Sequence, residues 1–355
     1  MDSLDLLLKL IRIAIGTESD FSIPIAANWG EVYELSESQG VCALCADVVG
    51  GKSEELGIAD DLLYSWIGQA MVQDTEYNYH VETIAKLANL YASEDMGMMV
   101  MKGYAASLMY PVPSHRCAGD VDIYLFGKGA AGDALMRKHG IVVKMNEDKH
   151  SSFVYGGIEI ENHASFVNVV EHPSLAELER ALEEECSVAS MVEVKDAKIF
   201  VPTPMHNALF LSRHLAAHFV YVGASMRQLV EWAVFVKRYG NEVDWYRVDE
   251  LAKGSGYDHF LHCLNGIVIA KFGVNSELFP EFERDEALEN RVFLEIVFPR
   301  YKSEGSALYK IRRFWGNKWK YRMVYKESMI ATLFRRGWAM FRSKYLPNSR
   351  SVWQR

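Results

Sequence analysis

The sequence has little that would mark a secreted, disulfide-bonded or membrane-spanning protein. Its 355 residues include five cysteines at uneven spacings, which gives no disulfide framework. It has no apolar run long enough to span a bilayer. The first residues carry acids at Asp2 and Asp5, where a signal peptide would have a basic start. We therefore expect a cytoplasmic protein with no transmembrane segment.

Low-complexity linkers, long polar spacers and internal repeats are also absent. Half of the residues are hydrophobic and 24% are charged, which is enough to bury a large core in two or three subdomains. The net charge of −9 conceals an asymmetry, because residues 300–355 contain fifteen Lys and Arg against two acids, whereas 1–299 carry 23 basic and 45 acidic residues. A basic tail after an acidic body indicates either an anionic partner or docking of the tail on the body.

Hydrophobic periodicity divides the chain into three parts. Residues 1–95 and 203–355 have apolar residues at spacings of three and four, which is typical of helices. Residues 96–202 contain short apolar runs and a strand meander, together with a helix for which Ser174 is the expected N-cap. The sequence therefore predicts an α+β fold, in which a small mixed β-sheet core is flanked by N-terminal and C-terminal helical regions.

Two acids stand one residue apart in an apolar strand, at Asp120 and Asp122. Side chains alternate along a strand, so these two acids share a face, as do Glu159, Glu161 and His163 on a later strand. If the strands are neighbours, three or four carboxylates converge, and their mutual repulsion favours a divalent cation such as Mg²⁺. Either Glu161 or Glu159 could be the third carboxylate.

The Asp-x-Asp pair has other interpretations, since most such pairs are solvent-facing or turn residues. It is not an EF-hand loop, because no Gly and no Glu follow at the sixth and twelfth positions. A metal-dependent glycosyltransferase could use the same pair, but it would need a βαβ nucleotide-binding half upstream, where residues 1–95 read as helical.

The segment before the acids has the features of a phosphate site. An apolar strand ends at Lys102-Gly103, and a short helix follows from Tyr104. This order places free backbone N–H groups where a polyphosphate can bind. Lys102 and Arg116 add positive charge on either side of the helix.

Together these elements resemble an uncharacterised bacterial nucleotidyltransferase family of the DNA polymerase β-like superfamily. The likeness extends loosely over residues 25–265. The residues that carry it are Lys102-Gly103, Tyr110-Pro111-Val112-Pro113, Arg116, Gly119-Asp120-Val121-Asp122 and Glu161-Asn162-His163.

The resemblance implies Mg²⁺-dependent transfer of a nucleoside monophosphate from an NTP to a hydroxyl acceptor. Asp120, Asp122 and Glu161 would hold two ions, and Glu161 could also accept the acceptor's proton. His163 would orient Glu161, contact the nucleotide or serve the structure alone. The acceptor could be a protein, a tRNA end or a small molecule. A catalytically silent nucleotide-binding or regulatory protein of the same fold is the alternative.

The same resemblance implies that the phosphates of the NTP are bound by Lys102, Gly103, Tyr104 and Arg116. Backbone N–H groups near Gly103 and Tyr104 would bind the β- and γ-phosphates, and the two cations would neutralise developing charge.

Candidates outside the motif have weaker patterns. His214 and His218 lie four residues apart on a predicted helix, and a helix face lining a cleft is favoured over a zinc site. Arg227 could reach a phosphate or pair with Glu231 on its own helix.

The basic tail, residues 301–355, mixes cations with aromatics. This composition is compatible with packing on the body, with binding of single-stranded nucleic acid, or with binding to an anionic membrane surface. Of these three, packing is favoured.

Overall fold

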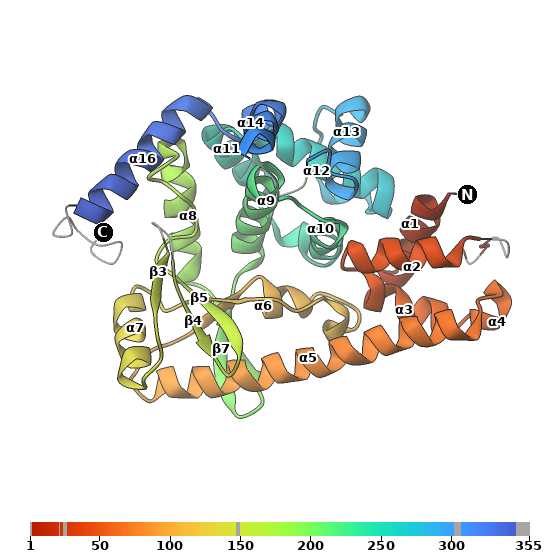
Figure 1. Cartoon of the computed structure of the whole chain (residues 1–355), viewed down its shortest axis with the longest axis horizontal. Helices are drawn as coiled ribbons and strands as arrows, with labels where there is room; N and C mark the ends of the chain where they lie inside the picture. Colours follow the sequence, from red (N-terminus) through yellow and green to blue (C-terminus); the bar gives the residue numbers. More distant parts are fainter. Residues whose placement is uncertain (1, 21, 24–26, 147–149, 302–306, 346–355) are drawn as a thin grey trace.

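The computed structural model describes the whole chain except residues 1, 21, 24–26, 147–149, 302–306 and 346–355. Helices lie on both sides of one mixed, seven-stranded sheet, which confirms the predicted α+β class (Figure 1). None of the described helices is long and apolar enough to cross a membrane.

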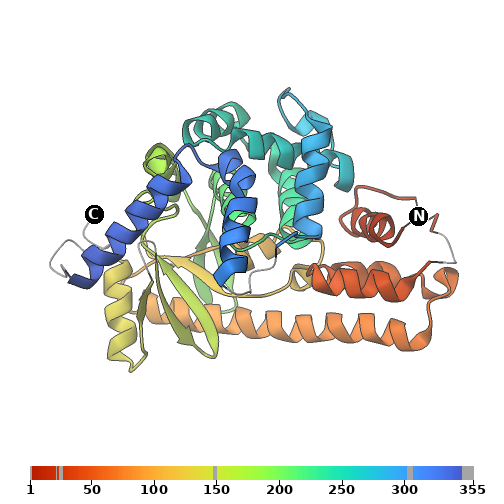
Figure 2. The same cartoon turned by 45° about the horizontal axis from the view of Figure 1, so that its top comes forward.

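The N-terminal region is helical, as predicted, and ends in one very long helix. The helices are α1 (Ser3–Ala14), α2 (Trp29–Ser38), α3 (Cys42–Gly50), α4 (Ser53–Leu56) and α5 (Asp60–Ala92). Gly40, with φ of +68°, supplies the left-handed turn that separates α2 from α3. Helix α5 runs from the other N-terminal helices to the sheet in both views (Figures 1 and 2). The proposed division at residues 95 and 202 stays a prediction.

The sheet has the order β3-β4-β5-β2-β1-β7-β6. Its strands are β1 (Met99–Met101), β2 (Val121–Tyr124), β3 (Lys144–Asn146), β4 (His150–Tyr155), β5 (Ile158–His163), β6 (Ser190–Val194) and β7 (Ala197–Val201). Strands β3, β4 and β5 form the predicted meander, and β2 pairs in parallel with β5. The connections contain α6 (Gly103–Ser107), α7 (Gly129–Lys138) and α8 (Ala176–Cys186), and 3₁₀ turns at Pro113–His115 and Pro173–Leu175.

The expected N-cap at Ser174 is wrong. Pro173 begins a 3₁₀ turn, and α8 starts only at Ala176. The backbone N–H and hydroxyl of Ser174 instead donate to the carboxylate of Glu327, which comes from the C-terminal region.

The C-terminal region is a helical assembly above the sheet. It consists of α9 (Pro204–Tyr221), α10 (Met226–Tyr239), α11 (Trp245–Ser255), α12 (Asp258–Phe272), α13 (Glu286–Val297), α14 (Ala307–Gly316), α15 (Lys318–Val324) and α16 (Met329–Tyr345), with 3₁₀ turns at Gly240–Glu242 and Ser276–Leu278. Of the basic tail, 302–306 and 346–355 lie outside the described residues.

The sheet separates two apolar cores. On one face, Val121, Ile123 and Ile160 pack with Ile84 and Tyr91 of α5. On the other face, Met99, Met101 and Phe166 join the large core that unites α8, α9 and the remaining helices. Because side chains alternate along β2, its acids lie on the second face, toward α9. The fold therefore places them between the sheet and the C-terminal helices.

Candidate active site

Three carboxylates converge where β2 and β5 run side by side. Asp122 is the direct register partner of Glu161, and Asp120 lies just before β2. Carboxylate oxygens from the three residues all lie within 4.8 Å of one another. We call this set the carboxylate cluster. Glu159 does not join it, since it is exposed and pairs with Val154 of β4; the structure thus groups Glu161, and not Glu159, with the two aspartates.

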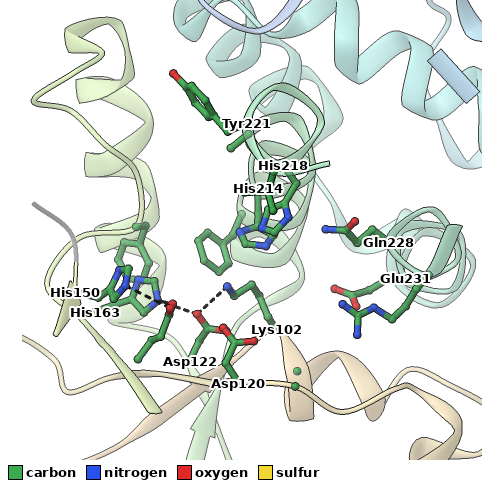
Figure 3. A pocket seen from close by; sticks show the side chains of 18 of the residues that line it. Lys102, Asp120, Asp122, His150, His163, His214, His218, Tyr221, Gln228 and Glu231 are labelled. Atoms are coloured by element: carbon green, nitrogen blue, oxygen red, sulfur yellow. Dashed lines mark hydrogen bonds and ion pairs between the residues drawn. The ribbon is translucent and has the colours of Figure 1, made fainter. Parts of the chain in front are cut away.

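Asp122 is buried and contacts two basic side chains, Lys102 and His163 (Figure 3). Its Oδ1 lies 2.7 Å from Nζ of Lys102 and 2.8 Å from Nε2 of His163. Burial alone would raise the pKa of Asp122, but the charge of Lys102 and the bond from His163 outweigh it, and the pKa is lowered. Burial likewise opposes the charged form of His163, yet its bonds to Asp122 and Glu161 leave its pKa raised. Asp122 and His163 therefore each favour the ionised form of the other.

Asp120 has the opposite environment. It is exposed at the mouth of the cleft, and its pKa is raised, first because surrounding protein displaces water from its carboxylate and then because Asp122 is negatively charged. The carboxylate cluster thus contains two acids whose ionised form is stabilised, Asp122 and Glu161, and one, Asp120, whose ionised form is destabilised. A bound cation would stabilise the ionised form of Asp120.

The backbone turns sharply between β1 and α6. Lys102 has φ of +42° and Gly103 has φ of +20°, and a positive φ is unusual for a residue with a side chain. Gly103 lines the cleft, whereas the ring of Tyr104 stacks on Tyr77 of α5 with centroids 6.1 Å apart. The Tyr104 side chain is consequently not among those that line the cleft.

The carboxylate cluster opens into a cleft of about 410 Å³ between the sheet, α9 and α10. His214 and His218 of α9 line it, with ring centroids 4.2 Å apart (Figure 3). Neither belongs to a group of three metal-ligating side chains in the described part of the chain, so the favoured interpretation as a cleft-lining helix face fits. The other lining residues include Phe166, Phe210, Tyr221, Arg227, Gln228 and Glu231.

The two predicted arginines have different partners. Arg116 forms a buried ion pair with Glu231, with Nη2 and Oε2 separated by 2.9 Å. Arg227 donates to the carbonyl oxygen of Cys117 at 3.2 Å and has no ion-pair partner among the described residues. The pairing of Arg227 with Glu231 that the i,i+4 spacing allowed is therefore wrong, because Arg116 takes that carboxylate. Arg227 thus lines the cleft without an acidic partner among the described residues, whereas the charge of Arg116 is neutralised by Glu231.

Sequence reasoning missed His150. It begins β4, pairs directly with His163 across the sheet, and lies with its Nε2 3.3 Å from Oε1 of Glu161. Two-residue alternation along the meander could have placed it on this face, but the register of β4 against β5 was not readable from the sequence. His150 lines the cleft beside the carboxylate cluster.

Comparison with known proteins identifies the family. The family model described as uncharacterised nucleotidyltransferase matches residues 26–271, which is more than half of the chain. No curated protein and no solved structure matches the chain. The matched range contains the carboxylate cluster and the parts of α9 and α10 that line the cleft, and it ends before the basic tail. The chain therefore belongs to this family of nucleotidyltransferases, and its general class of activity is nucleotidyl transfer.

Proposed function

We propose that this protein transfers a nucleoside monophosphate from an NTP to a hydroxyl acceptor in a Mg²⁺-dependent reaction of the DNA polymerase β-like type. The observation that carries the proposal is the convergence of Asp120, Asp122 and Glu161 within 4.8 Å, at one end of a cleft large enough for a nucleotide. The family match supports the reaction class.

The donor set suits magnesium. Three carboxylates offer hard oxygen ligands from one side only, which leaves positions for water and substrate phosphates. The raised pKa of Asp120 points the same way, because a nearby cation would remove the penalty for ionising it. When bound, the metal would polarise the phosphate under attack and offset charge on the leaving pyrophosphate.

The three cationic side chains near the carboxylate cluster would have different roles. Lys102 holds Asp122 in its charged form and lies beside the start of α6, where backbone N–H groups of Gly103 and Tyr104 would bind the β- and γ-phosphates. Arg227, whose charge is not paired with an acid in the described residues, is the better candidate for contact with a phosphate. Arg116 would hold α10 against the loop that precedes Asp120, through its pair with Glu231.

Glu161 is better suited to binding metal than to accepting a proton. Burial would raise its pKa, but the imidazoles of His150 and His163 beside its oxygens prevail and lower it far below the ordinary value. A carboxylate so weakly basic is a poor general base. We therefore assign Glu161 to metal binding, with His163 as the residue that positions both Glu161 and Asp122. His214 would contact the base or the acceptor from α9.

The experiment is label transfer from each α-labelled NTP to components of a cell extract, followed by mass spectrometry of the labelled product. We expect one NTP to give a Mg²⁺-dependent product, which would also reveal whether the acceptor is a protein, a tRNA or a small molecule. Asp120→Asn is the matched inactive variant. Transfer of sugar from a nucleotide sugar, with no transfer from any NTP, would identify a glycosyltransferase and overturn the proposal. NTP binding without turnover would indicate the silent alternative.

A further inference from the structure

Two imidazoles and one carboxylate meet on the cleft side of β4 and β5, next to the carboxylate cluster. His150 and His163 are direct register partners, and their ring centroids lie 5.3 Å apart. Glu161 lies between them, with Oε1 3.3 Å from Nε2 of His150 and Oε2 3.7 Å from Nε2 of His163. Ligand atoms from all three residues lie within 4.8 Å of one another. We call this set the histidine site.

These separations match those between ligands on one transition-metal ion. Zinc binds imidazole nitrogen and carboxylate oxygen at about 2.0–2.2 Å, so adjacent ligands of a tetrahedral ion lie about 3.4 Å apart. Both nitrogen–oxygen separations in the histidine site are within a few tenths of an ångström of that value. Nε2 of His163 also lies 2.8 Å from Oδ1 of Asp122, so an ion would replace that contact.

The chemistry of the site differs from that of the carboxylate cluster. Imidazole is a softer ligand than carboxylate, and two imidazoles with one carboxylate favour zinc and its neighbours over Mg²⁺. His163 is also oriented by its other nitrogen, because Nδ1 lies 3.3 Å from the carbonyl oxygen of Ser165. A carbonyl partner of this kind is the usual support behind a metal-binding histidine and directs Nε2 toward the ion.

We propose that His150, Glu161 and His163 form a second metal site that binds Zn²⁺, or another borderline divalent ion such as Co²⁺, with an open position for water or a phosphate oxygen. Zinc sites with three protein ligands commonly keep such a position. The site lies on the cleft and adjoins the carboxylate cluster, with which it shares Glu161.

The shared ligand makes the two sites antagonistic. Glu161 belongs to both groups, and His163 also bonds Asp122. An ion in the histidine site would take Glu161 from the carboxylate cluster and His163 from Asp122. Zinc would therefore weaken Mg²⁺ binding at the carboxylate cluster, and Mg²⁺ would weaken zinc binding by the same factor, because coupling between two ligands is reciprocal.

The test measures metal binding to the full chain without nucleotide, so it does not depend on nucleotidyl transfer. Zn²⁺ affinity is measured by competition with a chromophoric chelator, and Co²⁺ is used as a probe whose visible absorption reports nitrogen ligation. We expect His150→Asn to weaken Zn²⁺ binding at least tenfold and to remove the nitrogen-dependent Co²⁺ spectrum. His139→Asn, an exposed histidine after α7, is the matched control and should change neither.

A crossed variant identifies which site the ion uses. Asp120→Asn should leave the Co²⁺ spectrum in place, because Asp120 is not part of the histidine site. Melting curves of the metal-free variants check that both fold. Zinc binding that is unchanged in His150→Asn but lost in Asp120→Asn would mean that zinc occupies the carboxylate cluster, and would overturn the proposal. Unchanged binding in both variants would overturn it as well. Absence of nucleotidyl transfer by the wild-type protein, together with zinc binding that depends on His150, would count against the proposed function alone.

Discussion

The two faces of the β2–β5 pair both bury a carboxylate, but they satisfy it differently. Toward α7, Oδ1 of Asp133 accepts hydrogen bonds from Ser151 at 2.7 Å and Asn162 at 2.9 Å. Toward α9, Asp122 is paired with Lys102 and His163, two basic side chains that line a cleft. Neutral hydrogen-bond donors in a closed interior hold the structure in place. Charged side chains that line a cavity can instead give up their contact with each other when a charged ligand binds. We call the face toward α7 the supporting face and the face toward α9, on which we propose that the reaction takes place, the reacting face.

The largest effect should come from the reacting face. We predict that Asp122→Asn lowers nucleotidyl transfer at least about 1,000-fold, since the amide removes a charged oxygen from the carboxylate cluster. The measurement is Mg²⁺-dependent label transfer by the folded variant. A variant that keeps full activity would show that this face is not the reacting one.

The same variant tests how the cluster's charges are balanced. Repulsion among three acids would predict that Asp122→Asn stabilises the metal-free protein. The structure reverses that expectation, because Asp122 neutralises buried Lys102 at 2.7 Å, and its lowered pKa means that the charged form stabilises the fold. We expect the variant to melt at a lower temperature than the wild type, and Asp120→Asn to melt at the same or a higher temperature.

On the supporting face, loss of hydrogen bonds should change stability and leave the chemistry intact. Asn162→Ala removes a donor to Asp133 and leaves that buried carboxylate with fewer partners. We expect a cost of about 2–3 kcal/mol in the free energy of unfolding. Transfer per folded molecule should stay within a few-fold of the wild type. Val154→Ala, at an exposed position on neighbouring β4, is the control and should cost little. A large loss of activity at unchanged stability would erase the distinction between the two faces.

A third effect concerns a histidine behind the reacting face. His206 is fully buried against Phe166 and Phe210, and neither ring nitrogen has a hydrogen-bond partner among the described residues. Burial lowers its pKa to about 3. The unfolded chain therefore binds a proton below pH 6.5 that the folded protein excludes, so stability is lost as the pH falls from about 6.5 toward 3.

At pH 5 that loss should be about 2 kcal/mol for this residue, relative to pH 7.5. His206→Phe should remove this part of the acid sensitivity, measured as the difference in unfolding free energy between the two pH values. His139→Phe is the matched control, because His139 is exposed. An unchanged pH dependence in His206→Phe would show that the buried imidazole can be protonated in the folded protein.

Local patterns predicted much of this site, and long-range packing supplied the rest. Alternation along one strand was enough to place Asp120 and Asp122 on a common face, and the family-like order pointed to Glu161. The partners of Arg116 and Arg227 could not be predicted, because they depend on how α10 packs against the loop after Pro113–His115. The register of β4 decides the position of His150, and a one-residue slip would reverse its face. Asn162 interrupts an apolar pattern for a reason visible only in three dimensions, namely Asp133 on α7.

The smallest effect is expected in the basic tail. One of its helices is packed into the core, and another exposes apolar side chains. Helix α15 and the residue after it are part of the large core through Tyr321, Val324 and Tyr325, whereas Phe334 of α16 is 75% exposed. Val324→Ala should cost about 2 kcal/mol through lost burial. Phe334→Ser should change stability by no more than about 0.5 kcal/mol.

RNA binding at several salt concentrations tells whether that exposed surface has a partner. If the tail serves packing alone, wild type and Phe334→Ser will both fail to bind. If Phe334 stacks on a nucleic-acid acceptor, the wild type will bind with an affinity that falls steeply with salt, because binding releases counterions, and Phe334→Ser will bind several-fold more weakly. That result, with unchanged melting, would contradict our preference for packing and would place the acceptor of the proposed reaction among nucleic acids.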